Sequence, residues 1–377
     1  MKKGLNILRI PFPVWAGLLL MALLAAACGP AAPTAAPAPT EAPAAAPTEA
    51  PAATPTEAPA AEAAPEMSLE EAAEAEGGQL MVYTSMNIDD LEEVLAKFRE
   101  TYPFVSTEYY RAKGEGVIQK ALTEAQAGQH FADVFETNAF EVYRLLEQDL
   151  LAPYVAPESA AYPDNAKDPD GFWTVDRINT VVIAYNTELV DPADVPSTWE
   201  ELLDPKWKGL VGVEAGDVEL LADMVGAWGE ERTTTFWQGI AAQEPGIVDG
   251  HTELAELVAA GEFAISPTLY GHRVEKLKAK DAPLEWVRTD PVFAYTQLLA
   301  MAADAPHPAT AKLFINWLLS EEGQGAIRDV GRIPGRPGMT TNPPGLTEGL
   351  NLYYTIPSLA ENYNDYAETW FSFFSLE

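Results

Sequence analysis

Three short polar turns each follow an apolar stretch and precede a helical pattern. They run from Thr84 to Asn87, from Lys113 to Gly116, and over Thr137 and Asn138. Helix starts offer unpaired backbone N–H groups and a partial positive charge, which suit a bound anion. The turns therefore predict a site for a small polar anion, with these candidate contacts: Ser85, Asn87, Gly114, Glu115, Thr137 and Asn138.

The elements that must position these turns are three strand-to-helix units. The strands are expected at 79–83, 105–110 and 132–135, and the helices at 88–102, 117–127 and 139–148. Three such units in succession are typical of a parallel sheet covered by helices. In an open parallel sheet the ligand crevice lies outside the C-terminal ends of the strands, so the three turns are expected to face one cleft.

A central buried strand is predicted from Ile178 to Tyr185, because this stretch is β-branched and aromatic with few polar interruptions. Arg177 directly precedes it. A guanidinium at this place is suited to fork onto a carboxylate, phosphate or phosphonate, so Arg177 is a candidate ligand contact. The alternative is a salt-bridged surface residue.

The second half of the chain repeats the strand-to-helix pattern. Strands are expected at 211–213, 261–265 and 284–287, and helices at 218–228, 233–242, 252–260 and 274–280. The apolar stretch from Phe293 to Ala303 is expected to recross to the first domain, so that two strands form the hinge. The helices at 309–320 and 322–330 and the aromatic tail around Trp370 are expected to pack on that first domain.

The N-terminus has the pattern of a secretion signal and a linker. Basic residues precede an apolar run that ends in small residues and Cys28, the only cysteine, which predicts a lipoprotein signal over 1–28 and lipidation of Cys28. The alternative is an uncleaved anchor helix. Residues 29–78 are rich in Ala, Pro, Thr and Glu and predict a disordered tether, because such a segment has too little apolar bulk to form a core.

Charge and motifs exclude two classes of function. The formal charge of −34 argues against nucleic acid, whose phosphates need a basic surface. The sequence holds no G-x-S-x-G, H-E-x-x-H or P-loop motif, so no enzyme activity and no cofactor are expected. The four histidines are isolated in the sequence, and a lone histidine is more often structural than catalytic: His130, His251, His272 and His307.

Several blocks carry a resemblance to a known family. They read LMVYTSM at 80–86, ADVFETNAF at 132–140, YNTELV at 185–190, STWEELLDPKWKG at 197–209 and HPATAKLFINWLLSEEGQ at 307–324. Together these blocks resemble the extracellular solute-binding proteins of ABC importers, in the cluster that includes the ferric-ion, phosphonate, thiamine and polyamine binders. The resemblance spans roughly residues 79 to 335.

This resemblance implies an α/β fold of the type 2 periplasmic-binding-protein kind. Each of two lobes is a mainly parallel sheet flanked by helices, and two hinge strands join them. The first lobe is expected over 79–178 and 291–377, and the second over 179–290. The resemblance also places Tyr270 in the cleft, on the second-lobe side.

The ligand is expected to be a small organic or phosphonate-like anion, with ferric iron or an iron complex second and a polyamine or thiamine third. The ferric members resembled here use a histidine, a glutamate and two adjacent tyrosines. The matching positions carry Asn87, Asn138, Leu269 and Tyr270, a poor donor set for uncomplexed Fe³⁺. Tyr270 is the metal ligand if the solute is ferric.

The expected function is the solute-binding component of an ABC importer, which captures its solute between the lobes and delivers it to a permease served by an ATPase. The chain is expected to be a monomer, lipid-anchored on the outer face of the cytoplasmic membrane. The alternative is a ligand-sensing surface lipoprotein that is not coupled to transport.

Overall fold

The computed structural model describes residues 67–375, and the expected signal, Cys28 and most of the expected tether lie outside this range. The first lobe is built on three parallel strands in the order β2-β1-β3. One face of each following helix is apolar at helical spacing, as in α2, where Leu91, Val94, Leu95 and Phe98 are buried. The elements are β1 (Gln79–Thr84), α2 (Ile88–Thr101), β2 (Ser106–Arg111), α3 (Gly114–Gln126), β3 (Val134–Asn138) and α4 (Ala139–Leu146). The predicted parallel sheet is confirmed.

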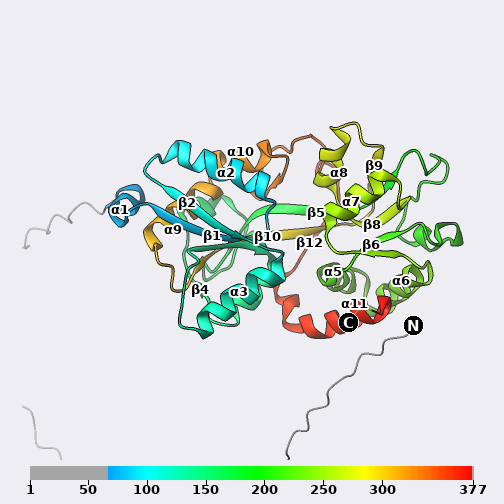
Figure 1. Ribbon diagram of the computed structural model, residues 1–377, viewed down its shortest axis with the longest axis horizontal. Helices are drawn as coiled ribbons and strands as arrows, with labels where there is room; N and C mark the ends of the chain where they lie inside the picture. The colour runs from blue at the N-terminus through cyan, green and yellow to red at the C-terminus, as the bar shows by residue number, and fades with distance from the viewer. Residues whose placement is uncertain (1–66, 376–377) are drawn as a thin grey trace, which may run out of the picture. The chain divides into compact units, whose positions relative to one another are not determined.

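Two long strands connect the lobes. β5 (Thr174–Asn186) and β10 (Val292–Ala302) pair antiparallel, with Phe293 opposite Val181 and Leu299 opposite Thr174. β10 continues the first-lobe sheet by pairing with β3, while β5 pairs with two second-lobe strands, β8 (Ile265–Tyr270) and β9 (Leu284–Val287). Both strands are almost wholly buried, as expected for strands covered on both faces. The two crossing strands predicted from the sequence are therefore confirmed, and they run between the two groups of helices in Figure 1.

The second lobe combines antiparallel pairing on β5 with a small parallel pair, β6 with β7. One face of β5 packs with the surrounding helices in a core that includes the fully buried Trp199 and Trp237, and the other face packs in a second cluster with α7 and α8. The further elements of this lobe are β6 (Gly212–Glu214), α5 (Val218–Trp228), α6 (Glu230–Ala242), β7 (Gly246–Val248), α7 (His251–Ala260) and α8 (Gly271–Lys278).

Residues 69–76 form helix α1 (Leu69–Glu76), so the prediction that the tether extends to residue 78 is wrong at its C-terminal end. Ser68 and Glu71 close a capping box at its start. The Glu76 carboxylate accepts backbone N–H groups of Ala309 and Thr310 at the start of α9 (Pro308–Leu319). A capped start and a helix partner thus order a stretch whose bulk composition resembles a linker.

Helices α9 and α10 (Glu321–Asp329) pack on the first lobe, as predicted. Phe314 of α9 lies edge-on to Phe98 of α2, with ring centroids 5.0 Å apart. The short elements of the fold are β4 (Leu151–Ala152), β11 (Ile333–Pro334), β12 (Leu352–Tyr354) and the 3-10 helices η1 (Pro157–Ala161), η2 (Asp164–Ala166), η3 (Glu200–Leu203), η4 (Pro205–Trp207) and η5 (Pro357–Asn362). In residues 67–375 no helix is long and apolar enough to cross a membrane.

The aromatic tail packs on the second lobe, so its predicted place on the first lobe is wrong. Helix α11 (Tyr363–Phe374) lies along α5 and α6 (Figure 1). Trp370 is fully buried with its ring 4.7 Å from that of Trp237, and its indole N–H donates to the carbonyl of Ala215 at 2.7 Å. The tail covers an aromatic surface of the second lobe. Residues far apart in the sequence make this contact, so no local sequence pattern predicts it.

Candidate functional site

The three polar turns of the first lobe lie side by side at the C-terminal ends of β1, β2 and β3. The backbone N–H of Ser85 donates to the Glu136 carbonyl at 3.1 Å and links the first turn to the third. Arg111, at the end of β2, donates to the Met86 carbonyl at 3.2 Å and to the Asn87 amide oxygen at 3.4 Å, which links the first turn to the second. The predicted convergence of these turns is confirmed as geometry, and the ligand roles of their residues stay predictions.

Polar side chains on two of these turns do not cap the helices that follow them. Asn87 and Asn138 are the N-cap residues of α2 and α4, yet neither side chain makes a capping hydrogen bond. Thr137 is fully buried and its hydroxyl has no hydrogen-bond partner among the described residues. Buried polar groups in proteins are normally paired, so the Thr137 hydroxyl marks a place where a partner is missing.

Two other candidates are engaged within the first lobe. Gly114 begins α3 close to α4, and a Cβ at this position would meet the Glu141 carboxylate, which would have to move. The carboxylate of Glu115 accepts from Arg144 at 2.7 Å and from the amide of Gln119 at 2.8 Å. Its charge is therefore already compensated on the first lobe.

Arg177 lies at the crossing between the lobes, but its guanidinium faces an internal partner. It is 1% exposed, and one of its terminal nitrogens lies 2.7 Å from a carboxylate oxygen of Glu136 on β3. Removing one member of such a buried pair leaves an uncompensated charge, at a typical cost of about 3–5 kcal/mol. Arg177 thus holds β5 to β3, and its contact with a solute stays a prediction.

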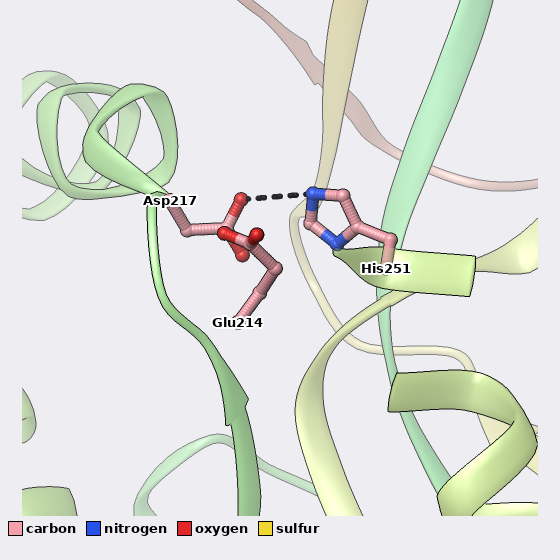
Figure 2. Close-up of side chains that lie close together, drawn as sticks. All are labelled: Glu214, Asp217 and His251. Carbon is pink, nitrogen blue, oxygen red and sulfur yellow. Dashed lines mark ion pairs between the residues drawn. The ribbon is translucent and has the colours of Figure 1, made fainter. Parts of the chain in front are cut away.

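The turns of the second lobe bring Glu214, Asp217 and His251 together, and Figure 2 shows their side chains facing one another. One donor atom from each lies within 4.8 Å of the others. The His251 Nδ1 lies 2.8 Å from the Thr268 carbonyl, and its Nε2 lies 3.2 Å from Asp217 Oδ1. Tyr270 covers this cluster, with its ring centroid 3.9 Å from that of His251.

Sequence reasoning missed this cluster. His251 is isolated in the sequence from the two acids that face it in the structure, Glu214 and Asp217. Each residue instead occupies the turn after a strand, β6 for Glu214 and Asp217 and β7 for His251. The rule used for the first-lobe turns, applied to the second lobe, would have placed them together.

The electrostatics of this region are dominated by buried acids. Burial raises the pKa of Glu219 well above its ordinary value, and the nearby carboxylate of Glu141 on the other lobe raises it further. Burial also raises the pKa of Glu141 to about 7. Burial opposes charge on His251, but the Asp217 carboxylate outweighs it and raises the pKa of the ring to about 9. Acidic groups of both lobes therefore crowd together where α4 meets α5, and burial favours their neutral forms.

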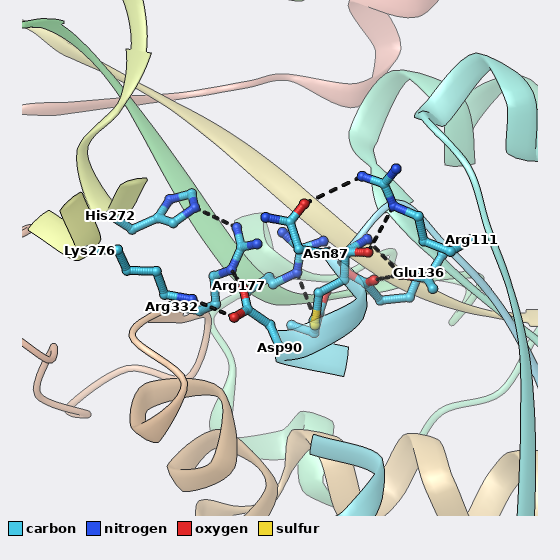
Figure 3. Close-up of polar contacts among 11 residues, drawn as sticks. Asn87, Asp90, Arg111, Glu136, Arg177, His272, Lys276 and Arg332 are labelled. Atoms are coloured by element: carbon cyan, nitrogen blue, oxygen red, sulfur yellow. Dashed lines mark hydrogen bonds and ion pairs between the residues drawn. The ribbon is translucent and has the colours of Figure 1, made fainter. Parts of the chain in front are cut away.

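Ion pairs hold the lobes against each other (Figure 3). Asp90 on α2 contacts Lys276 on α8, and it also accepts from Arg332 at 2.6 Å. Arg332 in turn donates to His272 Nε2 on α8 at 2.6 Å. Lys113 makes a further pair with Asp249, from the first lobe to the second. These contacts define a closed arrangement of the two lobes.

Comparison with known proteins identifies the family. Residues 128–352 match the family described as bacterial extracellular solute-binding protein. Iron uptake protein A1 of Synechocystis sp. is 27% identical over 266 residues, which are 65% of this chain and 72% of the relative.

Solved structures share the two-lobe fold. Iron-bound HitA from Pseudomonas aeruginosa aligns with a TM-score of 0.70 at 20% identity, over 78% of this chain and 99% of that one. AfuA from Actinobacillus pleuropneumoniae, with fructose-6-phosphate bound, aligns with a TM-score of 0.71 at 21% identity, over 80% and 99%. The α/β two-lobe architecture predicted from the sequence is thereby confirmed. Because the family match spans more than half of the chain, the protein belongs to the bacterial extracellular solute-binding proteins.

Proposed function

We propose that the protein captures a small, positively charged solute between its lobes and delivers it to the permease of an ABC importer. Membership of the solute-binding family supports the carrier role. The charge of the solute is inferred from the residues that meet where the lobes close.

Unpaired buried carboxylates from both lobes carry this proposal. Glu141 on α4, Asp217 at the start of α5 and Glu219 on α5 each have a buried carboxylate oxygen without a hydrogen-bond partner among the described residues. Burying a charge is costly unless it is paired, and two carboxylates that face each other add repulsion. A cation bound in the closed form would lie among acids of both lobes and would favour their ionised forms.

An anionic solute is less well matched, although the sequence favoured one. The helix starts of the first lobe suit an anion. The basic residues beside them are engaged, Arg111 with Met86 and Asn87 and Lys113 with Asp249. An anion that reached the second lobe would meet the carboxylates of Glu214 and Asp217. We therefore rank a cationic solute above an anionic one, the reverse of the order expected from the sequence.

The mechanism follows from a two-state clamp. The solute enters between the open lobes and contacts both of them only when they close, so it stabilises the closed form. The closed carrier then docks on the permease, and an ATPase drives release. Lipidation of Cys28 would keep the carrier at the outer face of the membrane, at the end of its N-terminal segment.

A ligand panel tests the charge of the solute. Thermal unfolding and calorimetry of the protein would be compared with Zn²⁺, Mn²⁺, ferric citrate, spermidine, thiamine, 2-aminoethylphosphonate and fructose-6-phosphate. We expect cations to raise the melting temperature and Glu219→Gln to weaken their binding at least about tenfold, the effect of about 1.4 kcal/mol. Glu147→Gln, an exposed change at the end of α4, serves as the control. Stabilisation by anions alone, with cations inert, would overturn the proposal.

A further inference from the structure

We infer that Glu214, Asp217 and His251 form a site for a first-row transition-metal cation on the second lobe. The inference rests on the proposed function, since it names the kind of cation that the closed lobes would hold. It differs from the sequence-based expectation, which assigned a metal to Tyr270. Each of the three residues supplies one ligand to the new site, and the three lie on two neighbouring strand-to-helix connections.

The spacing of the donors fits a single ion. Metal–nitrogen and metal–oxygen bonds to histidine and carboxylate are about 2.0–2.2 Å long, which places neighbouring ligand atoms about 3.0–3.4 Å apart in octahedral or tetrahedral geometry. His251 Nε2 and Asp217 Oδ1 are 3.2 Å apart, and a Glu214 oxygen lies within 4.8 Å of both. The Glu214 carboxylate would have to move toward this pair to complete the set.

His251 is oriented in the manner of a metal ligand. Its Nδ1 lies 2.8 Å from the carbonyl oxygen of Thr268, which only accepts hydrogen bonds, so Nδ1 carries the proton. Nε2 therefore faces the two carboxylates (Figure 2), where a protonated ring donates to Asp217, and a metal ion would take the place of that proton. Metal-binding histidines typically donate their other ring N–H to a carbonyl or carboxylate in this way.

The carboxylates are also held in place by their surroundings. Glu214 accepts the backbone N–H groups of Gly216 and Gly250, and Tyr295 donates to Asp217 Oδ1 at 3.1 Å. Asp217 is the N-cap residue of α5 but makes no capping hydrogen bond. It is 3% exposed, and its Oδ2 has no hydrogen-bond partner among the described residues. This orphaned buried oxygen is the observation that asks for a ligand.

The donor types set the class of cation. Two carboxylates and one imidazole suit ions that accept both oxygen and nitrogen, such as Mn²⁺, Fe²⁺ and Zn²⁺. Mg²⁺ and Ca²⁺ prefer oxygen ligands, and Mg²⁺ also keeps several waters. We therefore expect Zn²⁺ and Mn²⁺ to bind more tightly than Mg²⁺ or Ca²⁺.

Calorimetry with Zn²⁺ and Mn²⁺ tests the site, using Asp217→Asn and His251→Gln against Asp223→Asn. The control changes a buried carboxylate on the same helix, which accepts from Thr355 and lies outside the cluster. We expect one tight site in the unaltered protein. Each cluster variant should lose at least about 10–100-fold in metal affinity, because even changes to residues that only support the ligands cost this much. The control variant should lose little. Equal affinities in all three variants, or no tight site, would refute the assignment.

A spectroscopic measurement covers the case in which a cluster variant does not fold. Electron spin-echo modulation of Mn²⁺ bound to the unaltered protein reports whether a histidine nitrogen is coordinated. Nitrogen modulation is expected, and its absence would contradict ligation by His251. If spermidine or thiamine stabilises the protein while metals do not bind, the metal site is wrong and the cationic solute stands; if no cation binds, both are wrong.

Discussion

The contact between Asp90 and Lys276 should control how far the lobes close. Lys276 belongs to α8 and Asp90 to α2, so opening the lobes separates them. Lys276→Met removes the ammonium and keeps most of the apolar stem. It leaves Asp90 paired with Arg332, which lies on the same side of the interface.

The size of the effect follows from burial. Exposed ion pairs contribute roughly 0–1 kcal/mol, and removing a partner from a buried pair costs about 3–5 kcal/mol. The Asp90 side chain is 8% exposed, but that of Lys276 is 29% exposed and Arg332 still compensates the carboxylate. We therefore expect a loss of about 1–2 kcal/mol, which lowers the ratio of closed to open forms about 5–30-fold.

Distances between spin labels on the two lobes measure this ratio. Cysteines at Thr123 on α3 and Glu253 on α7, both exposed, carry the labels in a Cys28→Ser background that removes the only native cysteine. Lys278→Met is the matched control, because Lys278 lies on the same helix and pairs with acids of its own lobe. A wider distance distribution is expected for Lys276→Met alone. Identical distance distributions in the two variants would refute the role of the contact between Asp90 and Lys276 in closure.

Four further outcomes follow from the same structure. Burial raises the pKa of Asp90, but its basic partners outweigh burial and hold the pKa below the ordinary 3.8. The contribution of Asp90 to closure, measured as the difference in closed fraction between the unaltered protein and Asp90→Asn, should therefore be constant at neutral pH and disappear below about pH 4. Trp370→Ala should lower the free energy of unfolding by about 3–5 kcal/mol in urea titrations, because it leaves a cavity where the buried indole packs on the second lobe. Ser68→Ala should cost about 1 kcal/mol through the lost cap, seen as faster amide exchange in α1. Cys28→Ser should move the protein from the membrane fraction to the soluble fraction, and an unchanged distribution would contradict lipid anchoring.

Most of the first lobe was predictable, because its signals are local. Apolar stretches of strand length alternate with helical spacing, and the polar turns between them must meet at one edge of a parallel sheet. Ser85, Asn87 and Asn138 accordingly lie on adjoining turns. The apolar parts of the two crossing strands were predictable for the same reason. β5 begins four residues before the predicted Ile178, at Thr174, and this added part holds the buried polar residues Asp176 and Arg177.

The errors arose where a partner distant in the sequence decides the outcome. Residues 69–76 have linker-like composition, but Ser68 caps them and Glu76 binds the start of α9. Trp370 finds Trp237 more than a hundred residues away. Arg177 is next to a predicted cleft, yet its counter-charge is Glu136 on another strand. Local composition and spacing do not predict such contacts between residues that are distant in the sequence.

Charge is distributed unevenly over the interface between the lobes, and this distribution explains how a solute could control closure. Complementary pairs such as Lys113 with Asp249 and Lys276 with Asp90 favour closing without any solute. Glu141 and Glu219 oppose closing, because burial disfavours their ionised forms and the two carboxylates repel each other when ionised. Each also has a buried oxygen without a hydrogen-bond partner among the described residues. A cation that binds between these acids removes the opposing term and leaves the favourable pairs unchanged. Its affinity is then coupled to closure by the repulsion it relieves, so a carrier with this charge pattern would stay open until its solute arrives.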